Sequence, residues 1–248
     1  MTIDYPTETV DLRQLWKEAF GDSDAFLGIF FAKGYSPRRC RCITDGDTVA
    51  AALYWFDCSL EGRKIAYLYA VATAISHRGK GLCRQLMADT HALLASQGYA
   101  GAILVPGEES LFDFYAKMGY QTISCAACHT CTPAESAADL TPLSPDAYAA
   151  RRRQLLPQGG VIQEGGNLAF LSELCDLYGG DGWVMAASTE KNILTAMEFL
   201  GDTVVTGGIL TALGKESGTF RTPGSAPFAM YLPFDNSPTP TYFGLAFD

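Results

Sequence analysis

Two glycines and three basic residues are interleaved at residues 78–84, which read Arg-Gly-Lys-Gly-Leu-Cys-Arg. Glycine lets the backbone approach a ligand closely where a side chain would collide with it. If a helix begins here, its first N–H groups lack partners within the helix and lie at its positive end, where phosphate groups bind. Arg78, Lys80 and Arg84 add positive charge. The segment therefore predicts a site for a nucleotide-type ligand that carries a diphosphate.

The neighbouring elements should place this segment at a common ligand position. An apolar strand over residues 64–72 leads into it, and an amphipathic helix follows it to residue 97. Residues 100–105 are predicted to form a short buried strand. Because a strand–helix–strand crossover is right-handed, the two strands should lie side by side and parallel. The glycines then stand at the carboxyl end of the first strand, facing the start of the helix.

The hydrophobic pattern of the whole chain predicts an α/β fold, with antiparallel strands ahead of this crossover. Helices are expected at residues 8–20, from a cap at Asp22 or Ser23 through Phe31, and at 78–97 and 110–118; strands are expected at 39–44, 49–59, 64–72 and 100–105 and from Tyr120. Thr132–Pro145, rich in Pro, Ala, Ser and Thr, reads as a linker. Beyond it, helices are expected at 147–156, 167–178, 192–200 and 207–213, and strands at 183–187, 228–232 and 242–247.

Two motifs make the chain similar to the GNAT superfamily of N-acetyltransferases, in a two-lobed, bacterial-type form. The family's first motif is Arg or Gln, two residues, Gly, one residue, then Gly or Ala; here Arg78, Gly81 and Cys83 occupy those places, Cys83 being a departure. The second is Tyr, three residues, then Gly-Phe or Gly-Tyr, matched by Tyr115 and by Gly119-Tyr120. The order of elements matches over residues 8–125, about half of the chain.

Two further positions depart from the family pattern. The family's first strand is short or absent here, because only Thr2–Tyr5 are available to form it. Glu108 stands where the family often has Asn, which affects contacts to the pantetheine arm.

This resemblance implies the acyl-CoA N-acyltransferase fold, a mixed central sheet with a splayed parallel strand pair flanked by helices. It implies an acetyl-CoA-binding domain over residues 1–132, a linker over 133–145 and a smaller α/β lobe over 146–248, which is either a degenerate copy of the first or a lid. No second Arg-x-x-Gly-x-Gly pattern occurs in that lobe, so we expect one cofactor site, in the first lobe.

The resemblance also implies the roles of individual residues. The pantetheine arm of acetyl-CoA would pair with the strand end at Val71, Ala72 and Thr73, and the pyrophosphate would lie over the first turn of the helix. The cofactor-binding residues of that turn are Arg78, Gly79, Lys80, Gly81, Leu82, Cys83 and Arg84. Tyr115 would give a proton to the leaving CoA thiolate, since the acid strength of a phenol is close to that of a thiol. The acetyl group would pass directly, in a ternary complex, to a primary amine.

The general base stays open, because the strand before the motif has no Glu over residues 64–69. Asp57, Glu61, Glu108 and Glu109 are candidates, as is a chain of waters. The terminal carboxylate of Asp248 is another, since the similar aminoglycoside-acetylating enzymes of the enhanced-intracellular-survival type use their C-terminus in this way. A catalytic role for His77 is less expected than a place in the turn.

Bulk composition narrows the function classes. The 248 residues are 48% hydrophobic and carry a net charge of −9, which disfavours nucleic acid as a partner. Residues 1–5 show neither a basic region nor an apolar run, and no stretch is long enough to span a membrane, so we expect a cytoplasmic protein with reduced cysteines. A small-molecule or peptide amine is the expected acceptor, and a homodimer stays open.

Other patterns are interpreted as structural. Cys125, Cys128 and His129 have the spacing of covalent haem attachment, but cysteines on a strand more often fill the core, so we expect no metal or haem. Cys40 and Cys42 are expected to be packing residues. The run Arg151–Arg153 is read as one solvated helix face, with the 3′-phosphate of CoA as an alternative partner. The alternative function is a non-catalytic acyl-CoA-binding sensor that does not depend on Tyr115.

Overall fold

The apolar runs of the first half form five neighbouring β-strands in the computed structural model, which describes residues 1–6 and 8–247. The strands follow one another in the order of the chain, β1 to β5. Neighbours are antiparallel except β4 and β5, which are parallel as predicted. The strand bounds are β1 Thr2–Asp4, β2 Cys40–Asp45, β3 Thr48–Leu60, β4 Arg63–Thr73 and β5 Tyr99–Leu104. The four strands predicted between residues 39 and 105 are thus confirmed.

These five strands belong to the first of two compact units. Unit 1 comprises Met1–Leu104 and Leu232–Ser237, and unit 2 comprises Val105–Tyr231 and Pro238–Asp248. The domain boundaries expected at residues 132 and 146 fall within unit 2 and stay predictions.

The helices of unit 1 begin and end at residues suited to those positions. Helix α1 (Val10–Phe20) stops at Gly21, which takes a left-handed φ of 74° that glycine adopts without strain. Helix α2 (Asp24–Ile29) is capped by the Ser23 hydroxyl, which accepts the Phe26 N–H. The predicted helix through Phe31 changes after Ile29 into a single π-helical turn, Phe30–Gly34. Helix α3 (Leu82–Ser96) begins four residues later than predicted.

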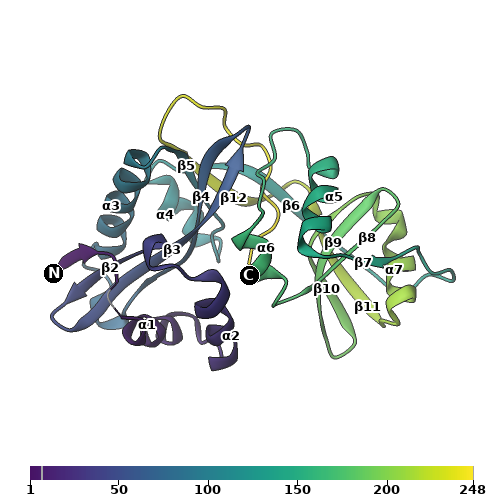
Figure 1. Ribbon diagram of the computed structural model, residues 1–248, viewed down its shortest axis with the longest axis horizontal. Coiled ribbons are helices and arrows are strands. Elements are labelled where there is room, and N and C mark those ends of the chain that lie inside the picture. The colour runs from purple at the N-terminus through teal and green to yellow at the C-terminus, as the bar shows by residue number, and fades with distance from the viewer. Residues whose placement is uncertain (7, 248) are drawn as a thin grey trace. The chain divides into compact units, whose positions relative to one another are not determined.

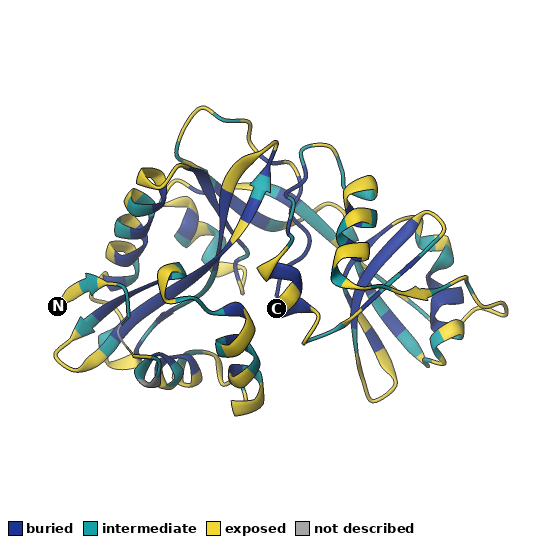
Figure 2. Cartoon of the chain, viewed as in Figure 1, coloured by how far each residue is buried: buried dark blue, intermediate teal, exposed yellow. Residues whose placement is uncertain are grey.

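Two layers of helices enclose the sheet of unit 1. Helix α1 packs against β3 and β4 on one face, and α3 lies on the other (Figure 1). The Trp16 ring of α1 lies 5.2 Å from the ring of Tyr54 and 5.7 Å from that of Tyr69. On the opposite face, Arg41 of β2 donates from Nη2 to Asp89 of α3 at 2.6 Å. Each large apolar side chain that is buried between a helix and the sheet stabilises the folded state by about 1.5–3 kcal/mol. The central strands are accordingly the most buried elements (Figure 2).

The strands of the second half lie side by side in the order β12-β6-β11-β10-β9-β8-β7. Their bounds are β6 Gln121–Cys131, β7 Thr141–Pro142, β8 Asp176–Gly180, β9 Trp183–Glu190, β10 Ile193–Leu200, β11 Ser217–Pro223 and β12 Ala226–Pro233. The helices of unit 2 are α4 Ser110–Ala116, α5 Pro145–Leu155, α6 Gly166–Leu171 and α7 Thr206–Leu213. The core gathers buried apolar side chains from these strands and α7, among them Trp183, Met185, Phe199, Ile209 and Phe220. Across the described residues, no helix has both the length and the apolar character needed to span a bilayer.

Three predictions for the second half are wrong. Residues 192–200, expected to be helical, form strand β10, because Lys191 and Asn192 both take positive φ and make a hairpin turn with β9. The helix expected over 167–178 ends at Leu171, and its last residues belong to β8. Residues 242–247 form no strand and contribute only a bridge from Tyr242 to Gly160. Strands β7, within the expected linker, and β11 were not predicted.

The two units share one order of elements. In unit 1, the antiparallel strands β2, β3 and β4 lead through α3 to β5, which is parallel to β4. In unit 2, the antiparallel strands β8, β9 and β10 lead through α7 to β11, which is parallel to β10. In both, a single 3-10 turn precedes the crossover helix, Ile75–His77 in one and Thr203–Val205 in the other.

Candidate functional site

The loop before α3 has the backbone conformation that its glycines allow. Gly79 and Gly81 take φ values of 75° and 77°, in the left-handed region that favours glycine. A Cβ at either position would meet no protein atom within 4 Å. The glycines are therefore required by the turn itself, and the space above them is open to a ligand. The Arg78, Lys80 and Arg84 side chains are exposed beside it.

Helix α3 begins at this loop with its first turn uncapped by a side chain. Gly81 is the N-cap residue, and its carbonyl accepts the N–H of Gln85 at 3.1 Å. The N–H groups of Leu82, Cys83 and Arg84 precede that first helical bond, and such groups have no partner within a helix. They lie at the positive end of the helix dipole, next to the exposed basic residues. This arrangement suits a phosphate or pyrophosphate.

Cys83, the residue that departs from the family pattern, is half-buried in this turn. Burial raises the pKa of its thiol to about 11, and the nearby Arg84 only partly opposes this. The side chain is therefore a small neutral group near pH 7. It preserves the close packing that Gly or Ala gives at this place in the family.

Arg78 is bound to the strand end that precedes the loop. Its Nε donates to the Thr73 carbonyl at 3.2 Å, across the 3-10 turn Ile75–His77. The hydrogen bond closes the loop on itself. Arg78 thus helps to hold the loop in shape as well as providing charge.

Strand β4 departs from its neighbours over the residues predicted to bind the pantetheine arm. Its pairing with β5 runs only from Lys64 to Tyr67, so β4 continues for six residues beyond the last pair. Pairing with β3 shifts register just before Ala72, where Ala70 takes φ 50°. A left-handed conformation costs alanine about 1 kcal/mol, and such a bulge re-aims the local backbone groups. The splay and the bulge together bring Val71, Ala72 and Thr73 to an irregular strand end beside the loop.

Tyr115 lies in unit 2, at the end of α4, and is 7% exposed. Its ring packs at 5.3 Å from Phe114 and, edge to face, at 5.8 Å from Tyr120. Its carbonyl accepts the N–H groups of Met118 and Tyr120, and Gly119 takes φ 95° between them. The second motif is thus the C-terminal turn of a short helix. The structure brings the residues that are predicted to bind the cofactor together in unit 1; their binding role and the catalytic role of Tyr115 stay predictions.

Among the base candidates of unit 1, Asp57 is already engaged. The Tyr99 hydroxyl donates to one of its oxygens, and Arg39 Nη1 donates to the other at 3.3 Å. Burial raises the pKa of Tyr99, and its hydrogen bond to Asp57 adds to the rise. Glu61 lies exposed in the β3–β4 turn with φ 48°. Asp57 is thus not placed as a free base, and a base role for Glu61 stays a prediction.

The remaining candidates, Glu108, Glu109 and His77, lie in exposed or turn positions. Glu108 accepts the Ser110 hydroxyl just before α4 and is exposed, as is Glu109. His77 has Nδ1 2.9 Å from the Ser76 hydroxyl and Nε2 3.3 Å from Asp45 Oδ2, as expected of a turn residue. Asp248 lies outside the described residues.

The arginine run is not one solvated face, which corrects the sequence-based interpretation. Successive helical residues point about 100° apart, so the three side chains separate. Arg151 donates to the Gly180 carbonyl and Arg153 pairs with Glu164 at the surface. Arg152 is 2% exposed and binds Glu198, itself fully buried, through Nε at 2.6 Å and Nη2 at 2.9 Å. Neither a solvated role nor a CoA phosphate is available to Arg152.

The cysteines behave as strand residues. Cys125 and Cys128 are three residues apart on β6, so their side chains point to opposite faces of the sheet. Among the described residues, no three His, Cys, Asp or Glu side chains gather as a metal site would require. Cys40 and Cys42 are buried on β2, where packing residues belong.

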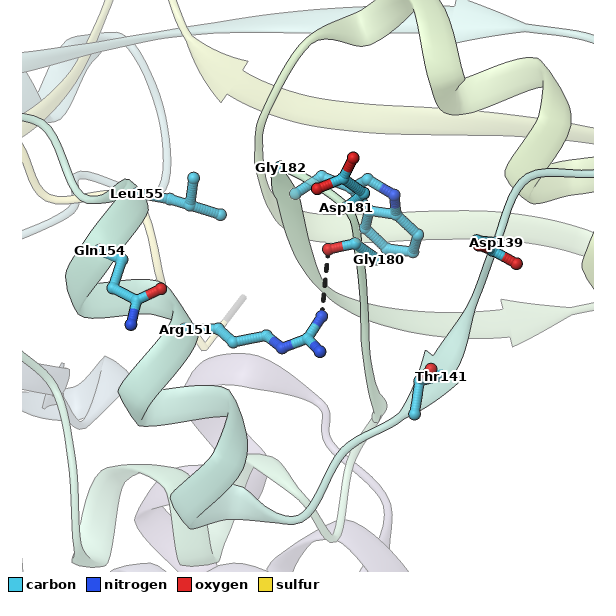
Figure 3. A pocket seen from close by; sticks show the side chains of 9 residues that line it. Asp139, Thr141, Arg151, Gln154, Leu155, Gly180, Asp181 and Gly182 are labelled. Atoms are coloured by element: carbon cyan, nitrogen blue, oxygen red, sulfur yellow. Dashed lines mark hydrogen bonds between the residues drawn. The ribbon is translucent and has the colours of Figure 1, made fainter.

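A cavity of about 580 Å³ lies in unit 2, beside the β8–β9 turn (Figure 3). Arg151 reaches across it to the Gly180 carbonyl at 3.1 Å (Figure 3). A cavity of about 500 Å³ lies in unit 1, between the edge strand β1, the start of α1 and the β2–β3 turn. None of the predicted site residues lines either of them.

Two features of the site could not be seen in the sequence. One is the bulge at Ala70, since nothing in the run Tyr67–Thr73 sets alanine 70 apart. The other is Glu18 of α1, whose Oε1 accepts the Ile75 N–H at 2.5 Å, directly ahead of the loop. A surface glutamate on an amphipathic helix gives no signal of such a contact.

Comparison with known proteins agrees with this geometry. Residues 5–123, just under half of the chain, match the acetyltransferase (GNAT) domain model. A GCN5-related N-acetyltransferase from Kribbella flavida is similar over 94% of this chain and 71% of its own, with 14% identity and a TM-score of 0.72. One from Anabaena variabilis is similar over 93% and 72%, with 14% identity and a TM-score of 0.68. One from Sphaerobacter thermophilus covers 98% of both chains, with 11% identity and a TM-score of 0.59.

No curated protein matches the chain. The structural likeness, at such low identity, establishes the fold, and the domain match establishes the family. Through residues 5–123, the chain belongs to the GNAT superfamily of acetyltransferases.

Proposed function

We propose that the protein is an acetyl-CoA-dependent N-acetyltransferase with its cofactor site in unit 1. The observation that carries the proposal is the open loop of Gly79 and Gly81, which ends at the exposed start of α3. Acetyl-CoA would supply an activated acetyl group, and the pyrophosphate would lie over the N–H groups from Gly79 to Arg84. The exposed Lys80 and Arg84 would neutralise its charge.

The splayed end of β4 supports a place for the pantetheine arm. Because β4 extends beyond its pairing with β5, its Val71–Thr73 edge can accept an extended ligand as an added strand. The bulge at Ala70 turns the neighbouring amides out of the regular pattern. An N–H near Val71 or Ala72 would then stabilise the carbonyl oxygen as negative charge develops on it.

The transfer requires two proton movements. The acceptor, a primary amine of a small molecule or peptide, must be neutral to attack the acetyl carbon, so a base or a water chain takes its proton. As the new C–N bond forms, the C–S bond breaks and negative charge develops on sulfur. Tyr115 would donate its phenolic proton there. Because Asp57 is already engaged by Tyr99 and Arg39, a water chain is the better proposal than Asp57 for the base.

We further propose that unit 2 is a degenerate copy without a cofactor site. Its crossover helix α7 begins at Thr206-Gly207-Gly208, but the chain's own segment covers that turn. The N–H groups of Ala134 and Ala138 donate to the carbonyls of Gly207 and Gly208, both at 3.0 Å. A Cβ at Gly208 would come within 3.0 Å of Ala138. The glycines here admit protein backbone where those of unit 1 are open.

The strand pair of unit 2 is closed as well. Strand β10 shifts register against β9 at Met197, at the place that corresponds to Ala70 of β4. Arg221 of β11 donates from Nε to the Met197 carbonyl at 2.6 Å. A side chain of the protein therefore occupies the bulge that a ligand would use in unit 1.

Thermal unfolding with and without acetyl-CoA tests the cofactor site. A ligand at 100 times its Kd stabilises a protein by about 2.7 kcal/mol, which raises Tm by roughly 5–10 °C at this chain length. We expect Gly81→Asp to weaken acetyl-CoA binding at least about tenfold, because it adds negative charge and backbone strain at the phosphate site.

Gly98→Asp is the matched control for that variant. Gly98 has φ 79°, has no neighbour that a Cβ would meet within 4 Å, and lies just after the opposite end of α3. It should cost similar stability and leave the acetyl-CoA shift intact. A folded wild-type protein whose Tm does not move with acetyl-CoA would end the acetyltransferase proposal.

Calorimetric titration tests the single site. We expect one acetyl-CoA per chain, with all binding weakened by Gly81→Asp, because α7 is covered by Ala134 and Ala138. A second equivalent bound, retained in Gly81→Asp, would show that unit 2 has a site and would contradict the degenerate assignment.

A further inference from the structure

The loop that leads to the phosphate site has little apolar anchoring at its start. After Ala74, whose N–H donates to the Ala50 carbonyl at 2.9 Å, the chain leaves the sheet. The next residue, Ile75, has its apolar side chain 61% exposed. Packing therefore does not fix its position. A polar contact does, because the Ile75 N–H donates to Oε1 of Glu18 at 2.5 Å.

The contact between Glu18 and Ile75 is linked to Arg78 through one further hydrogen bond. Ile75 begins the 3-10 turn Ile75–His77, and its carbonyl accepts the Arg78 N–H at 3.3 Å. Arg78 in turn binds the Thr73 carbonyl through Nε. The carboxylate of Glu18 accepts the first N–H of this turn. Its position therefore sets where the turn, and with it Arg78, begins.

Glu18 is held in place by a helix that cannot easily shift. Helix α1 buries Leu12, Leu15 and Trp16 in unit 1, each 4% exposed or less. Glu18 lies on the outer side of the same helix and is itself exposed. The contact therefore joins a well-packed helix to an exposed loop. Two residues further along the turn, His77 Nε2 lies 3.3 Å from Asp45 Oδ2.

We propose that Glu18 is a positioning residue that holds the loop of residues 74–81 in its binding conformation before acetyl-CoA arrives. The inference rests on the proposed function, since it assigns Glu18 to that same site. A loop already ordered in its bound form loses less conformational freedom on binding, so affinity rises without any contact to the ligand. Glu18 acts through the Ile75 amide and takes no part in the proton transfers.

The predicted effect is on affinity. Loss of one hydrogen bond of ordinary net strength weakens binding about three- to tenfold, so Glu18→Ala should raise the Kd for acetyl-CoA by that factor. Glu18→Gln keeps an acceptor oxygen and should restore most of the affinity. With an acceptor amine in hand, the KM for acetyl-CoA should rise in Glu18→Ala while kcat stays within about twofold of wild type.

The experiment is calorimetric titration of acetyl-CoA into wild type, Glu18→Ala, Glu18→Gln and Gln14→Ala. Gln14 is exposed one helical turn earlier on α1, so its replacement by alanine is a matched control that should bind as wild type does. Hydrogen exchange of the ligand-free proteins adds a second readout. We expect the Ile75 amide to exchange faster in Glu18→Ala than in Gln14→Ala.

The outcomes separate this inference from the proposed function. If wild type binds acetyl-CoA and Glu18→Ala binds equally well, the positioning role is wrong and the acetyltransferase proposal stands. If Gln14→Ala weakens binding as much as Glu18→Ala, the effect belongs to the helix and the role is again wrong. If wild type does not bind acetyl-CoA, the proposed function fails first, and the role of Glu18 fails with it.

Discussion

Tyr115→Phe is expected to lower kcat by about 100-fold or more while the Kd for acetyl-CoA stays within about twofold of wild type. The change removes one hydroxyl from a ring that is otherwise packed against Phe114 and Tyr120. Without its proton, charge on the departing sulfur has no acid to neutralise it. The measurement is thiol release with an amine found by screening, together with calorimetric titration of acetyl-CoA.

Tyr120→Phe is the control for this variant. Tyr120 is buried, packs edge to face on Tyr115 and belongs to the same motif. We expect it to keep most of the activity. Equal losses in both variants would mean that packing, and not the Tyr115 hydroxyl, matters. If wild type binds acetyl-CoA and no amine releases thiol, the sensor is the better description, and Tyr115→Phe would then leave the protein unchanged.

Arg152→Met is expected to lower the free energy of unfolding by about 3–5 kcal/mol, because it leaves the carboxylate of Glu198 buried without its cation. Burial by itself lowers the pKa of Arg152, but Glu198 more than offsets this, so the pair is held charged. The hydroxyls of Tyr148 and Tyr242 donate to the same carboxylate at 3.3 and 3.1 Å. Urea unfolding measures the loss.

The adjacent Arg153 supplies the comparison for that experiment. It pairs with Glu164 at the surface, so Arg153→Met should lower the free energy of unfolding much less than Arg152→Met does. The double variant Arg152→Met with Glu198→Leu removes both charges and should be more stable than Arg152→Met alone. A double variant that is less stable than the single one would show that the uncompensated charge is not the source of the loss.

Unit 1 could be predicted well because its signals are local and agree with one another. Long apolar runs bounded by Asp45-Gly46 and Glu61-Gly62 define the strands, and Gly79 and Gly81 define the loop. Unit 2 is harder because its strands are short and its turns are ambiguous. Asn192 was read as the start of a helix, whereas its positive φ closes a hairpin.

In the candidate site, too, the features that depend on local sequence could be predicted and those that depend on distant elements could not. The glycines and charges of the loop are specified by residue type, so the sequence reveals them. The contact of Glu18 with Ile75, the bulge at Ala70 and the burial of Arg152 depend on elements distant in the chain. Side-chain type alone cannot indicate which of three consecutive arginines turns inward, because that depends on where Glu198 lies.

The shared topology makes unit 2 an internal reference for unit 1. The crossover helix has 15 residues in α3, where the loop is open, and 8 in α7, where the chain covers it. The difference that bears on phosphate binding is the turn at the start of each helix, which is open at Gly79 and Gly81 and is covered at Gly207 and Gly208. If the proposed function holds, replacing α7 and the turn before it with α3 and its loop should give unit 2 a phosphate-binding turn, because the strand order of unit 2 already matches that of unit 1.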